Sequence, residues 1–306
     1  MAEIGIIVVT YNSGTVIGRC LDAAITTGAE IVVVDNASAD GTRAEVERRG
    51  VRLIANSANL GFAAAVNQGF RAFDCLYVLL LNPDVALTTS IEPMREACDL
   101  PDMAGAGGML LDANGRRQIG FMARRLPTPA ALATEALLLN RIWPDNPVNR
   151  RYRCLRLDYN VLQPVEQPAG ALLMIRRAVW EELGGFEEHF WPIWFEDVDF
   201  CRRARNRGYG FVYVPQVVAI HTGAHSISPL TMEMRRVYWY RSLLSYSVRH
   251  FRPLGRRAVC LAVIIGSLFR APFEAARERS LRPLAAYWKV ARLAGACWIG
   301  GRSWCP

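Results

Sequence analysis

Short continuous runs of apolar residues occur along the first part of the chain and alternate with segments of helical spacing. Runs of this kind, bounded by turn residues, predict strands that are buried on both faces of a parallel sheet. The predicted strands are Ile4–Val9, Ile31–Val34, Val51–Ala55 and Leu76–Leu81. The segments between them that have the period of a helix are Val16–Ile25, Thr42–Arg49 and Ala63–Phe73. This alternation with short connections predicts an α/β fold with a doubly wound, mostly parallel sheet.

The apolar run Leu76–Leu81 is followed directly by Asn82-Pro83-Asp84. Pro83 cannot donate to a strand ladder and favours an extended Asn82, so the strand is expected to end there. Asp84 would then lie at the carboxyl end of a central strand, where open α/β sheets bind their ligands. A carboxylate at that place can hold a divalent cation against a phosphate, or it can simply complete a polar turn. This stretch by itself leaves both interpretations open.

Polar residues follow each of the four predicted strands at its carboxyl end. They are Thr10 and Asn12, Asp35 and Asn36, Asn56 and Asn59, and Asn82 and Asp84. Turns account for some of these residues, because any sheet needs polar connections. Parallel strands end at the same edge of a sheet, however, so the four clusters together predict a ligand site there.

The middle of the chain keeps this pattern only in part. A helix at Pro93–Ala97 and a glycine-rich strand at Ala104–Leu111 are predicted before prolines and arginines interrupt the pattern from Asp112 to Gln163. We expect a hairpin, a helix near Ala130–Leu139 and a long excursion in that segment. Long irregular segments of compact domains are often binding loops or lids.

Regular structure is predicted again from Pro168 onward. The expected elements are a strand at Pro168–Ile175, a helix at Ala178–Leu183, and two short strands, Phe211–Val214 and Val217–Ile220, on either side of Pro215. Before these two strands, Glu196-Asp197-Val198-Asp199-Phe200 opens a helix that is expected to continue through Arg207. Acidic residues in a first helical turn are stabilised by the helix dipole, which is a purely structural reason for all three acids.

Helical periodicity dominates from about Thr231, and arginines and aromatic residues crowd this part of the chain. We therefore expect an α/β domain at residues 1–230 and a basic helical region at residues 231–306. The apolar run Ala258–Phe269 is shorter than the roughly 18 residues that a membrane-spanning helix needs. Basic amphipathic helices with aromatic residues are typical of proteins that bind anionic membrane surfaces.

The basic region has two other interpretations besides membrane binding. A helical subdomain that packs on the core, or against a second copy in a homodimer, would show a similar pattern. Nucleic-acid binding could use the same charges, but no recognition motif accompanies them, so nucleic acid is not an expected partner.

Composition limits the class of protein. The chain has 306 residues, a net charge of +8 and 52% hydrophobic residues, which indicates a globular protein. Its eight cysteines are scattered without a Cys-x-x-Cys pair, which argues against a zinc site and a disulfide framework and favours a reducing cytosol. No charged region followed by an apolar segment precedes the first strand, so no signal peptide is expected. Lys289 is the only lysine, an arginine preference that codon bias in a GC-rich genome would also give.

An ordered set of motifs resembles the inverting glycosyltransferases of family 2, which have the GT-A fold. The motifs are Val8-Val9-Thr10-Tyr11-Asn12, Val34-Asp35-Asn36-Ala37-Ser38, Asn59-Leu60-Gly61-Phe62-Ala63, Leu81-Asn82-Pro83-Asp84, Gly170-Ala171-Leu172-Leu173-Met174-Ile175-Arg176-Arg177, Phe195-Glu196-Asp197-Val198-Asp199 and His221. The resemblance covers Ile4 to about Ser226. The Asn-Pro-Asp turn and the Asn-Leu-Gly-Phe loop are most similar to the rhamnosyltransferase branch, whose members commonly transfer rhamnose from dTDP-rhamnose to a lipid-linked or polysaccharide acceptor.

The resemblance implies a nucleotide site at the sheet edge. Thr10, Tyr11 and Asn12 would line the nucleotide, and Asp35 would read its pyrimidine ring. The other residues that would take part in nucleotide binding are Asn36, Asn59, Gly61 and Asn82.

The resemblance also implies a metal and a base. Asp84 would hold a divalent metal, Mg²⁺ or Mn²⁺, that bridges the two phosphates, with His221 as a further ligand. Asn82 stands where the family usually has the first acid of an Asp-x-Asp pattern, so the metal would have one carboxylate fewer. Asp197 would be the general base and Glu196 its neighbour. Inversion needs one such base, placed opposite the leaving nucleotide.

Three further residues near the implied base remain ambiguous. Asp199 is expected to be only a cap or a surface acid. Trp191 and Trp194 could stack on acceptor sugar rings, or they could equally be core aromatic residues.

The first hypothesis is a metal-dependent inverting glycosyltransferase, peripheral on the inner face of the cytoplasmic membrane, that transfers rhamnose during cell-envelope glycan synthesis. Two alternatives stay open: transfer from another donor such as UDP-galactofuranose, and a nucleotide-sugar-binding module without activity. A non-catalytic module would have no reason to keep both Asp84 and Asp197. A nucleotidyltransferase is not expected, because Thr10–Gly14 lacks a glycine- and arginine-rich phosphate loop.

Overall fold

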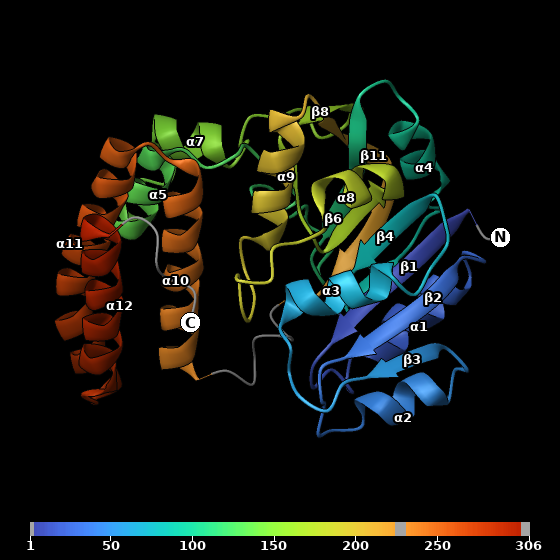
Figure 1. Cartoon of the computed structure of the whole chain (residues 1–306), viewed down its shortest axis with the longest axis horizontal. Coiled ribbons are helices and arrows are strands. Elements are labelled where there is room, and N and C mark those ends of the chain that lie inside the picture. The colour runs from blue at the N-terminus through green and yellow to red at the C-terminus, as the bar shows by residue number, and fades with distance from the viewer. Residues whose placement is uncertain (1–2, 224–230, 301–306) are drawn as a thin grey trace. The chain divides into compact units, whose positions relative to one another are not determined.

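The computed structural model describes residues 3–223 and 231–300, which form two compact units (Figure 1). The first unit comprises Met1–Leu126, Arg153–Glu188 and Glu196–Pro229, and the second comprises Pro127–Tyr152, His189–Phe195 and Leu230–Pro306. The second unit thus includes two segments that precede the domain boundary expected at residue 230. That boundary itself lies outside the described residues.

A mixed, mostly parallel sheet forms the centre of the first unit. Its strands in the described residues are β1 (Ile4–Thr10), β2 (Glu30–Asp35), β3 (Arg52–Ala55), β4 (Tyr77–Leu81), β5 (Val85–Leu87), β6 (Met103–Leu111), β8 (Gln163–Val165), β10 (Leu172–Arg176) and β11 (Gly210–His221). They lie in the order β3-β2-β1-β4-β10-β6-β11-β5, and β8 pairs with β11. A two-strand ladder outside this sheet joins β7 (Ala123–Arg124) to β9 (Gln167–Pro168).

The register explains why β4 is central. β1 pairs in parallel with β2 on one side and with β4 on the other, while β10 pairs antiparallel with both β4 and β6. All five residues of β4 are buried. The predicted end of this strand is confirmed, because β4 stops at Leu81 and the chain turns through Asn82-Pro83-Asp84 into β5.

Helices cover both faces of the sheet. They are α1 (Ile17–Ile25), α2 (Thr42–Glu47), α3 (Phe62–Phe70), α4 (Glu92–Cys98), α8 (Arg177–Leu183) and α9 (Glu196–Asn206). Side chains of a strand alternate between faces, and β1 shows the result. Ile6 and Val8 belong to the core cluster that includes residues of α1 and α4, whereas Ile7 meets Gly69 of α3 on the other face.

The structure differs from the sequence expectation at two strands. The two short strands expected around Pro215 are one strand, β11, whose pairing with β6 shifts register between Val214 and Val218. Proline is tolerated at such an irregularity because no ladder hydrogen bond is required there. The strand expected at Pro168–Ile175 is divided, since β9 ends at Pro168 and β10 begins at Leu172.

The second unit is helical. Its helices in the described residues are α5 (Pro129–Ala136), α6 (Leu139–Ile142), α7 (Pro147–Tyr152), α10 (Met232–His250), α11 (Pro253–Glu278) and α12 (Arg282–Ile299). Figure 1 shows α10, α11 and α12 side by side, and α11 packs on both α12 and α5. Arg270 of α11 donates to the backbone oxygens of Glu135 and Ala136, at 3.0 and 2.9 Å, and so caps the end of α5.

The helix α11 is longer than the apolar run suggested. It continues on both sides of Ala258–Phe269 to a length of 26 residues. By length and composition alone, it is the one helix of the described residues that is long and apolar enough to cross a membrane, and 39% of its most apolar window is buried within the protein. The expectation that this segment is too short to span therefore does not hold for the helix as a whole.

Candidate functional site

Two loops at the carboxyl edge of the sheet are joined by hydrogen bonds from backbone to side chain. The Asn12 N–H donates to Ser38 Oγ at 2.8 Å, and the Ala39 N–H donates to Asn12 Oδ1 at 2.8 Å. The Ser13 N–H donates to Thr42 Oγ1 at 2.8 Å. Asn12 has φ 51, in the left-handed region that asparagine tolerates better than most residues. The loops after β1 and β2 thus form one polar surface.

Asp35 lies beneath this surface and is fully buried. Its carboxylate accepts from the Ser38 N–H at 3.0 Å, from the Ser38 hydroxyl, and from Arg43 Nε at 2.6 Å. A carboxylate offers about four acceptor sites, so these three donors use most of them. In this conformation Asp35 organises the loop after β2, and its reading of a pyrimidine ring stays a prediction.

Asn36, Asn59 and Gly61 fix the loop between β3 and α3. Asn36 donates to the Gly61 carbonyl oxygen at 3.1 Å and accepts from Asn56 Nδ2 at 3.1 Å. The Gly61 N–H donates to Asn59 Oδ1 at 2.9 Å, and Gly61 has φ 88, a value that favours glycine. The structure therefore brings these three predicted residues together with the loops after β1 and β2 at the same sheet edge.

Thr10 and Tyr11 end the first strand at this edge. Thr10 is buried, and its Oγ1 has no hydrogen-bond partner within the part of the chain that the structure describes. Tyr11 is half-buried. A buried hydroxyl without a partner is uncommon in native proteins, and the binding of a nucleotide at Thr10 stays a prediction.

Asp84 and His221, which the resemblance implies as metal ligands, face each other at the same edge, and their binding of a metal stays a prediction. His221 Nε2 lies 3.6 Å from Asp84 Oδ1, and both side chains are buried. Asp84 Oδ1 has no hydrogen-bond partner among residues 3–223 and 231–300. The backbone fixes the pair as well, because the Thr222 N–H donates to the Asp84 carbonyl oxygen at 3.1 Å.

The electrostatics of the pair favour a neutral imidazole. Burial lowers the pKa of His221 below its ordinary value of 6.5, and the negative charge of Asp84 partly opposes this effect. A neutral imidazole is the form that binds metals. No group of three or more His, Cys, Asp or Glu side chains in the described ranges could hold a metal ion by itself.

Asp197 is the second residue of α9, and protein atoms surround its carboxylate although the residue as a whole is half-buried. It accepts from the Gly170 N–H at 3.1 Å and from the Val198 N–H at 2.8 Å. Loss of hydration by burial raises the pKa of Asp197 above its ordinary value of 3.8. The two N–H donors and the positive charge of Arg124 oppose this rise. Arg124 was not predicted, because it lies in an irregular segment without a motif.

The backbone at Gly170 and Ala171 connects the Asp84 turn to Asp197. The Asn82 N–H donates to the Ala171 carbonyl oxygen at 3.1 Å, one residue from the amide that binds Asp197. A Cβ on Gly170 would lie 3.1 Å from Asp197 Oδ2, a tighter contact than most side chains make, so glycine suits this close approach. Asn82 itself is half-buried at the end of β4.

The other two acids of α9 are buried. Glu196 is 4% exposed, next to Asp197 in the first turn. Asp199 is fully buried and pairs with Arg203, whose Nε lies 2.7 Å from Asp199 Oδ2. Arg203 also donates to the backbone oxygens of Leu183 and Gly185. Of the two expectations for Asp199, a cap or a surface acid, the surface acid is therefore wrong, because its ion pair with Arg203 connects α9 to the end of α8.

Trp191 and Trp194 belong to the second unit. Trp191 is partly exposed and packs edge-on against Tyr238 of α10, with ring centroids 5.3 Å apart. Trp194 is half-buried and has φ 82. Their contact with an acceptor stays a prediction.

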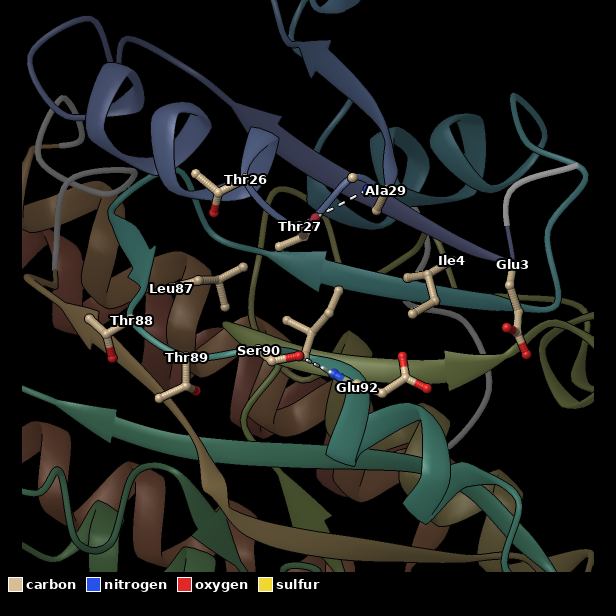
Figure 2. Close-up of a pocket in the computed structure, with 12 residues that line it drawn as sticks. Glu3, Ile4, Thr26, Thr27, Ala29, Leu87, Thr88, Thr89, Ser90 and Glu92 are labelled. Carbon is tan, nitrogen blue, oxygen red and sulfur yellow. Dashed lines mark hydrogen bonds between the residues drawn. The ribbon is translucent and has the colours of Figure 1, made fainter.

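A cavity of about 610 Å³ lies at the opposite edge of the sheet, where β1 begins (Figure 2). Hydroxyl groups on its wall are used by the protein itself. Thr27 donates to the Ala24 carbonyl oxygen, and Ser90 accepts from the Glu92 N–H. None of the predicted site residues lines this cavity.

Comparison with known proteins gives matches over most of the chain. The model of glycosyl transferase family 2 matches residues 5–182, and a model described as the N-terminal domain of galactosyltransferase matches residues 150–226. An N-acetylglucosaminyl-diphospho-decaprenol L-rhamnosyltransferase from Mycobacterium tuberculosis is 32% identical over 277 residues, which cover 80% of this chain and 88% of the relative. The low-salt glycan biosynthesis hexosyltransferase Agl10 of Haloferax volcanii is 28% identical over 72% of this chain and 67% of the relative.

A solved structure confirms the predicted GT-A architecture. A mannosyltransferase from Pyrobaculum calidifontis, in complex with GDP-Man and Mn²⁺, superposes with a TM-score of 0.53 at 15% identity. The superposition covers 99% of this chain and 88% of the other. At this identity the likeness bears on the fold alone.

Replacing Arg203 tests whether Asp199 is structural. Arg203→Met would leave a buried carboxylate without its cation, which typically destabilises a protein by about 3–5 kcal/mol. We expect a loss of this order in the free energy of unfolding, measured by urea denaturation. Arg207→Met is the matched control, since Arg207 forms an exposed pair with Glu182 at 3.5 Å, worth at most about 1 kcal/mol. Equal effects of the two substitutions would contradict the assignment.

Proposed function

The chain belongs to glycosyl transferase family 2 and is a nucleotide-sugar-dependent glycosyltransferase, and on this premise we propose that it transfers rhamnose from dTDP-rhamnose to a lipid-linked acceptor with inversion. The observation that carries the mechanism is the backbone connection at Gly170 and Ala171. The half-buried Asp197 accepts from the Gly170 N–H, and the next residue binds the Asn82 N–H in the turn that bears Asp84. The similarity to the mycobacterial rhamnosyltransferase supports the donor and acceptor class.

Asp197 acts as the general base in this proposal. The acceptor hydroxyl attacks the anomeric carbon of the sugar on the side opposite the nucleotide, and its proton passes to the Asp197 carboxylate. The new C–O bond forms as the bond from the anomeric carbon to the diphosphate oxygen breaks, and the diphosphate leaves with the electron pair. A raised pKa makes Asp197 a stronger base than an exposed carboxylate.

Asp84 and His221 fit a divalent metal such as Mg²⁺ or Mn²⁺. The fit is supported by the buried Asp84 Oδ1, for which the described residues provide no hydrogen bond. The 3.6 Å between Oδ1 and His221 Nε2 is longer than a hydrogen bond and shorter than twice the about 2.1 Å ligand distance of Mg²⁺. Such ions are commonly held by one or two side chains together with substrate phosphates. When bound, the metal would neutralise charge on the leaving diphosphate.

The remaining predicted residues complete the proposed site. Thr10, with its buried hydroxyl, and Asn12, which joins the first two loops, would bind the nucleotide. Adjacent helical residues point in different directions, so Glu196 and Asp197 can have different roles. Glu196 would orient an acceptor hydroxyl while Asp197 acts as the base.

Asp197→Asn tests the reaction itself. The substitution keeps the side-chain volume and removes the base, so we expect kcat to fall by at least about 10²-fold while donor binding is unchanged. Sugar transfer and calorimetric titration of dTDP-rhamnose measure the two properties. Retained turnover would exclude Asp197 as the base.

The pH dependence of the wild-type enzyme follows from the same carboxylate. The base must be ionised, so kcat/KM should fall on the acid side as pH drops through the raised pKa of Asp197, that is, above pH 3.8. Arg124→Met removes a charge that lowers this pKa, and the acid limb should move to higher pH. Arg125→Met is the matched control, because Arg125 faces Glu166 at 3.7 Å, and it should leave the limb in place.

Asp84→Asn tests the metal and the donor together. Calorimetric titration of dTDP-rhamnose, UDP-galactofuranose, UDP-glucose and GDP-mannose, each with and without Mn²⁺, gives the donor preference of the wild type. We expect Mn²⁺ to increase the affinity of the wild type for dTDP-rhamnose. In Asp84→Asn this increase should be smaller by a factor of at least about ten. The exposed Asp74→Asn is the control. An unchanged Mn²⁺ effect would refute the role of Asp84, and preference for another donor would overturn rhamnose.

The second unit would bind the inner face of the cytoplasmic membrane. The helix α11 buries one apolar face and exposes another, which a soluble helix rarely does. The exposed apolar side chains of α11 and α12 and of the turn between them are Leu254, Leu261, Leu268, Phe269, Phe273, Leu281, Leu284, Trp288 and Ile299. Exposed Arg257, Arg277 and Lys289 accompany them, as in helices that lie on anionic lipid.

Vesicle flotation tests the membrane proposal. Leu268, Phe269 and Phe273 are 67%, 75% and 70% exposed, and their joint replacement by Ser should abolish flotation with phosphatidylglycerol vesicles. Joint replacement of the exposed residues Ile25, Leu76 and Leu100 of the first unit is the control. Binding that resists both high salt and the triple replacement would favour a spanning α11, and a dimer without flotation would favour an interface between two copies.

A further inference from the structure

We propose that Gln118 is a positioning residue that holds His221 as the Nδ1–H tautomer and thereby directs the Nε2 lone pair toward Asp84. The inference rests on the proposed metal site and adds a residue to it. Gln118 lies 103 positions before His221 in the sequence and belongs to no motif. It makes two hydrogen bonds to that one residue.

The backbone fixes where Gln118 lies. The chain turns after β6 at Asp112, whose carboxylate accepts from the Asn114 and Arg116 N–H groups. It then returns along β6, so that the Gln118 N–H donates to the Leu110 carbonyl oxygen at 2.9 Å. The Gln118 carbonyl oxygen accepts from the Phe121 N–H at 3.0 Å. Both the N–H and the carbonyl group of Gln118 are hydrogen-bonded, so the position of its Cα is fixed.

The two hydrogen bonds determine the orientation of the amide. Gln118 Nε2 lies 2.8 Å from the His221 carbonyl oxygen, and this oxygen can only accept. The nitrogen of the amide must therefore face it, since the reversed amide would place two oxygens together. Gln118 Oε1 then lies 2.8 Å from His221 Nδ1. An amide oxygen can only accept, so Nδ1 must carry the proton.

The tautomer has a consequence on the other side of the ring. In a neutral imidazole with a proton on Nδ1, Nε2 is an acceptor. It points at Asp84 Oδ1, which is also an acceptor, across 3.6 Å. Two buried lone pairs that converge without a proton between them are unfavourable by themselves and suit a shared cation.

Phe121 restricts the ring further. Its aromatic ring stacks on that of His221, with centroids 5.2 Å apart and planes 18° apart. The preceding residue, Gly120, has φ 80, which lets the chain turn so that Phe121 follows Gln118 closely. Gln118 thus determines which ring nitrogen of His221 carries the proton, and Phe121 determines the plane of the ring.

Nitrogen NMR of histidine-labelled protein without metal tests the tautomer directly. The chain has four histidines, and His221→Ala identifies the signal of interest. At about pH 8, where imidazole is neutral, wild-type His221 should show a protonated Nδ1 and an unprotonated Nε2. Gln118→Met, which keeps length and loses both hydrogen bonds, should shift the population toward Nε2–H. Gln118→Glu keeps an acceptor for Nδ1–H, so Nδ1 should stay protonated in this variant.

Mn²⁺ binding, measured by electron paramagnetic resonance, tests the consequence. Gln118→Met should weaken binding about 10–100-fold, as is typical when the partner of a metal-binding histidine is lost. Gln163→Met is the control, because Gln163 donates to the Asp158 carbonyl oxygen in another loop. Gln118→Glu should bind more tightly than Gln118→Met.

The outcomes separate this inference from the proposed function. Wild-type binding that depends on His221 but not on Gln118, or an unchanged tautomer in Gln118→Met, would overturn the inference and leave the metal site intact. Wild-type protein that binds no Mn²⁺, or binds it independently of His221 and Asp84, would overturn the metal site itself.

Discussion

The backbone at Gly170 and Ala171 is the constraint on which the site depends. One peptide amide holds the carboxylate of Asp197, and the next residue's carbonyl oxygen holds the Asn82 amide at the end of β4. These two hydrogen bonds connect the two sides of the proposed site through one short stretch of backbone. Glycine suits this position, because a Cβ at residue 170 would lie 3.1 Å from Asp197 Oδ2 and would press on that carboxylate. Backbone groups have no side-chain rotamers, so the Gly170 N–H and the Ala171 carbonyl oxygen hold their partners with less loss of conformational entropy than a side chain would.

The polar residues at the sheet edge have two different functions. Asp35 and Asn36 are buried and form several hydrogen bonds to neighbouring loops, so they shape the site from below. Thr10 Oγ1 and Asp84 Oδ1 are buried atoms for which residues 3–223 and 231–300 provide no partner. Unsatisfied buried polar atoms destabilise a fold, and in the proposed site the nucleotide and the metal would complete these two. Burial also explains why the pKa of Asp197 is raised and that of His221 is lowered.

Much of the site could be predicted because its residues follow strands whose ends have local signals. The apolar run and Pro83 place Asp84, and the acids at a helix start place Asp197. Asp199 shows where such reasoning fails. Its position in a first turn suggested a surface acid, yet it is fully buried, because Arg203 one helical turn later reaches both it and the end of α8. Burial depends on neighbours that spacing alone does not give.

The sequence by itself determined the first four strands, the motifs that follow them and the sheet edge at which their polar residues meet, because the apolar period, proline and turn residues act over a few positions. Only the tertiary structure decided the antiparallel insertion of β10 between β4 and β6, and the meeting of Gln118 with His221. Those two residues lie 103 positions apart, and hydrogen bonds of that range leave no periodic trace in a sequence. Long-range pairing depends on how buried surfaces fit together, which is a property of the folded chain as a whole.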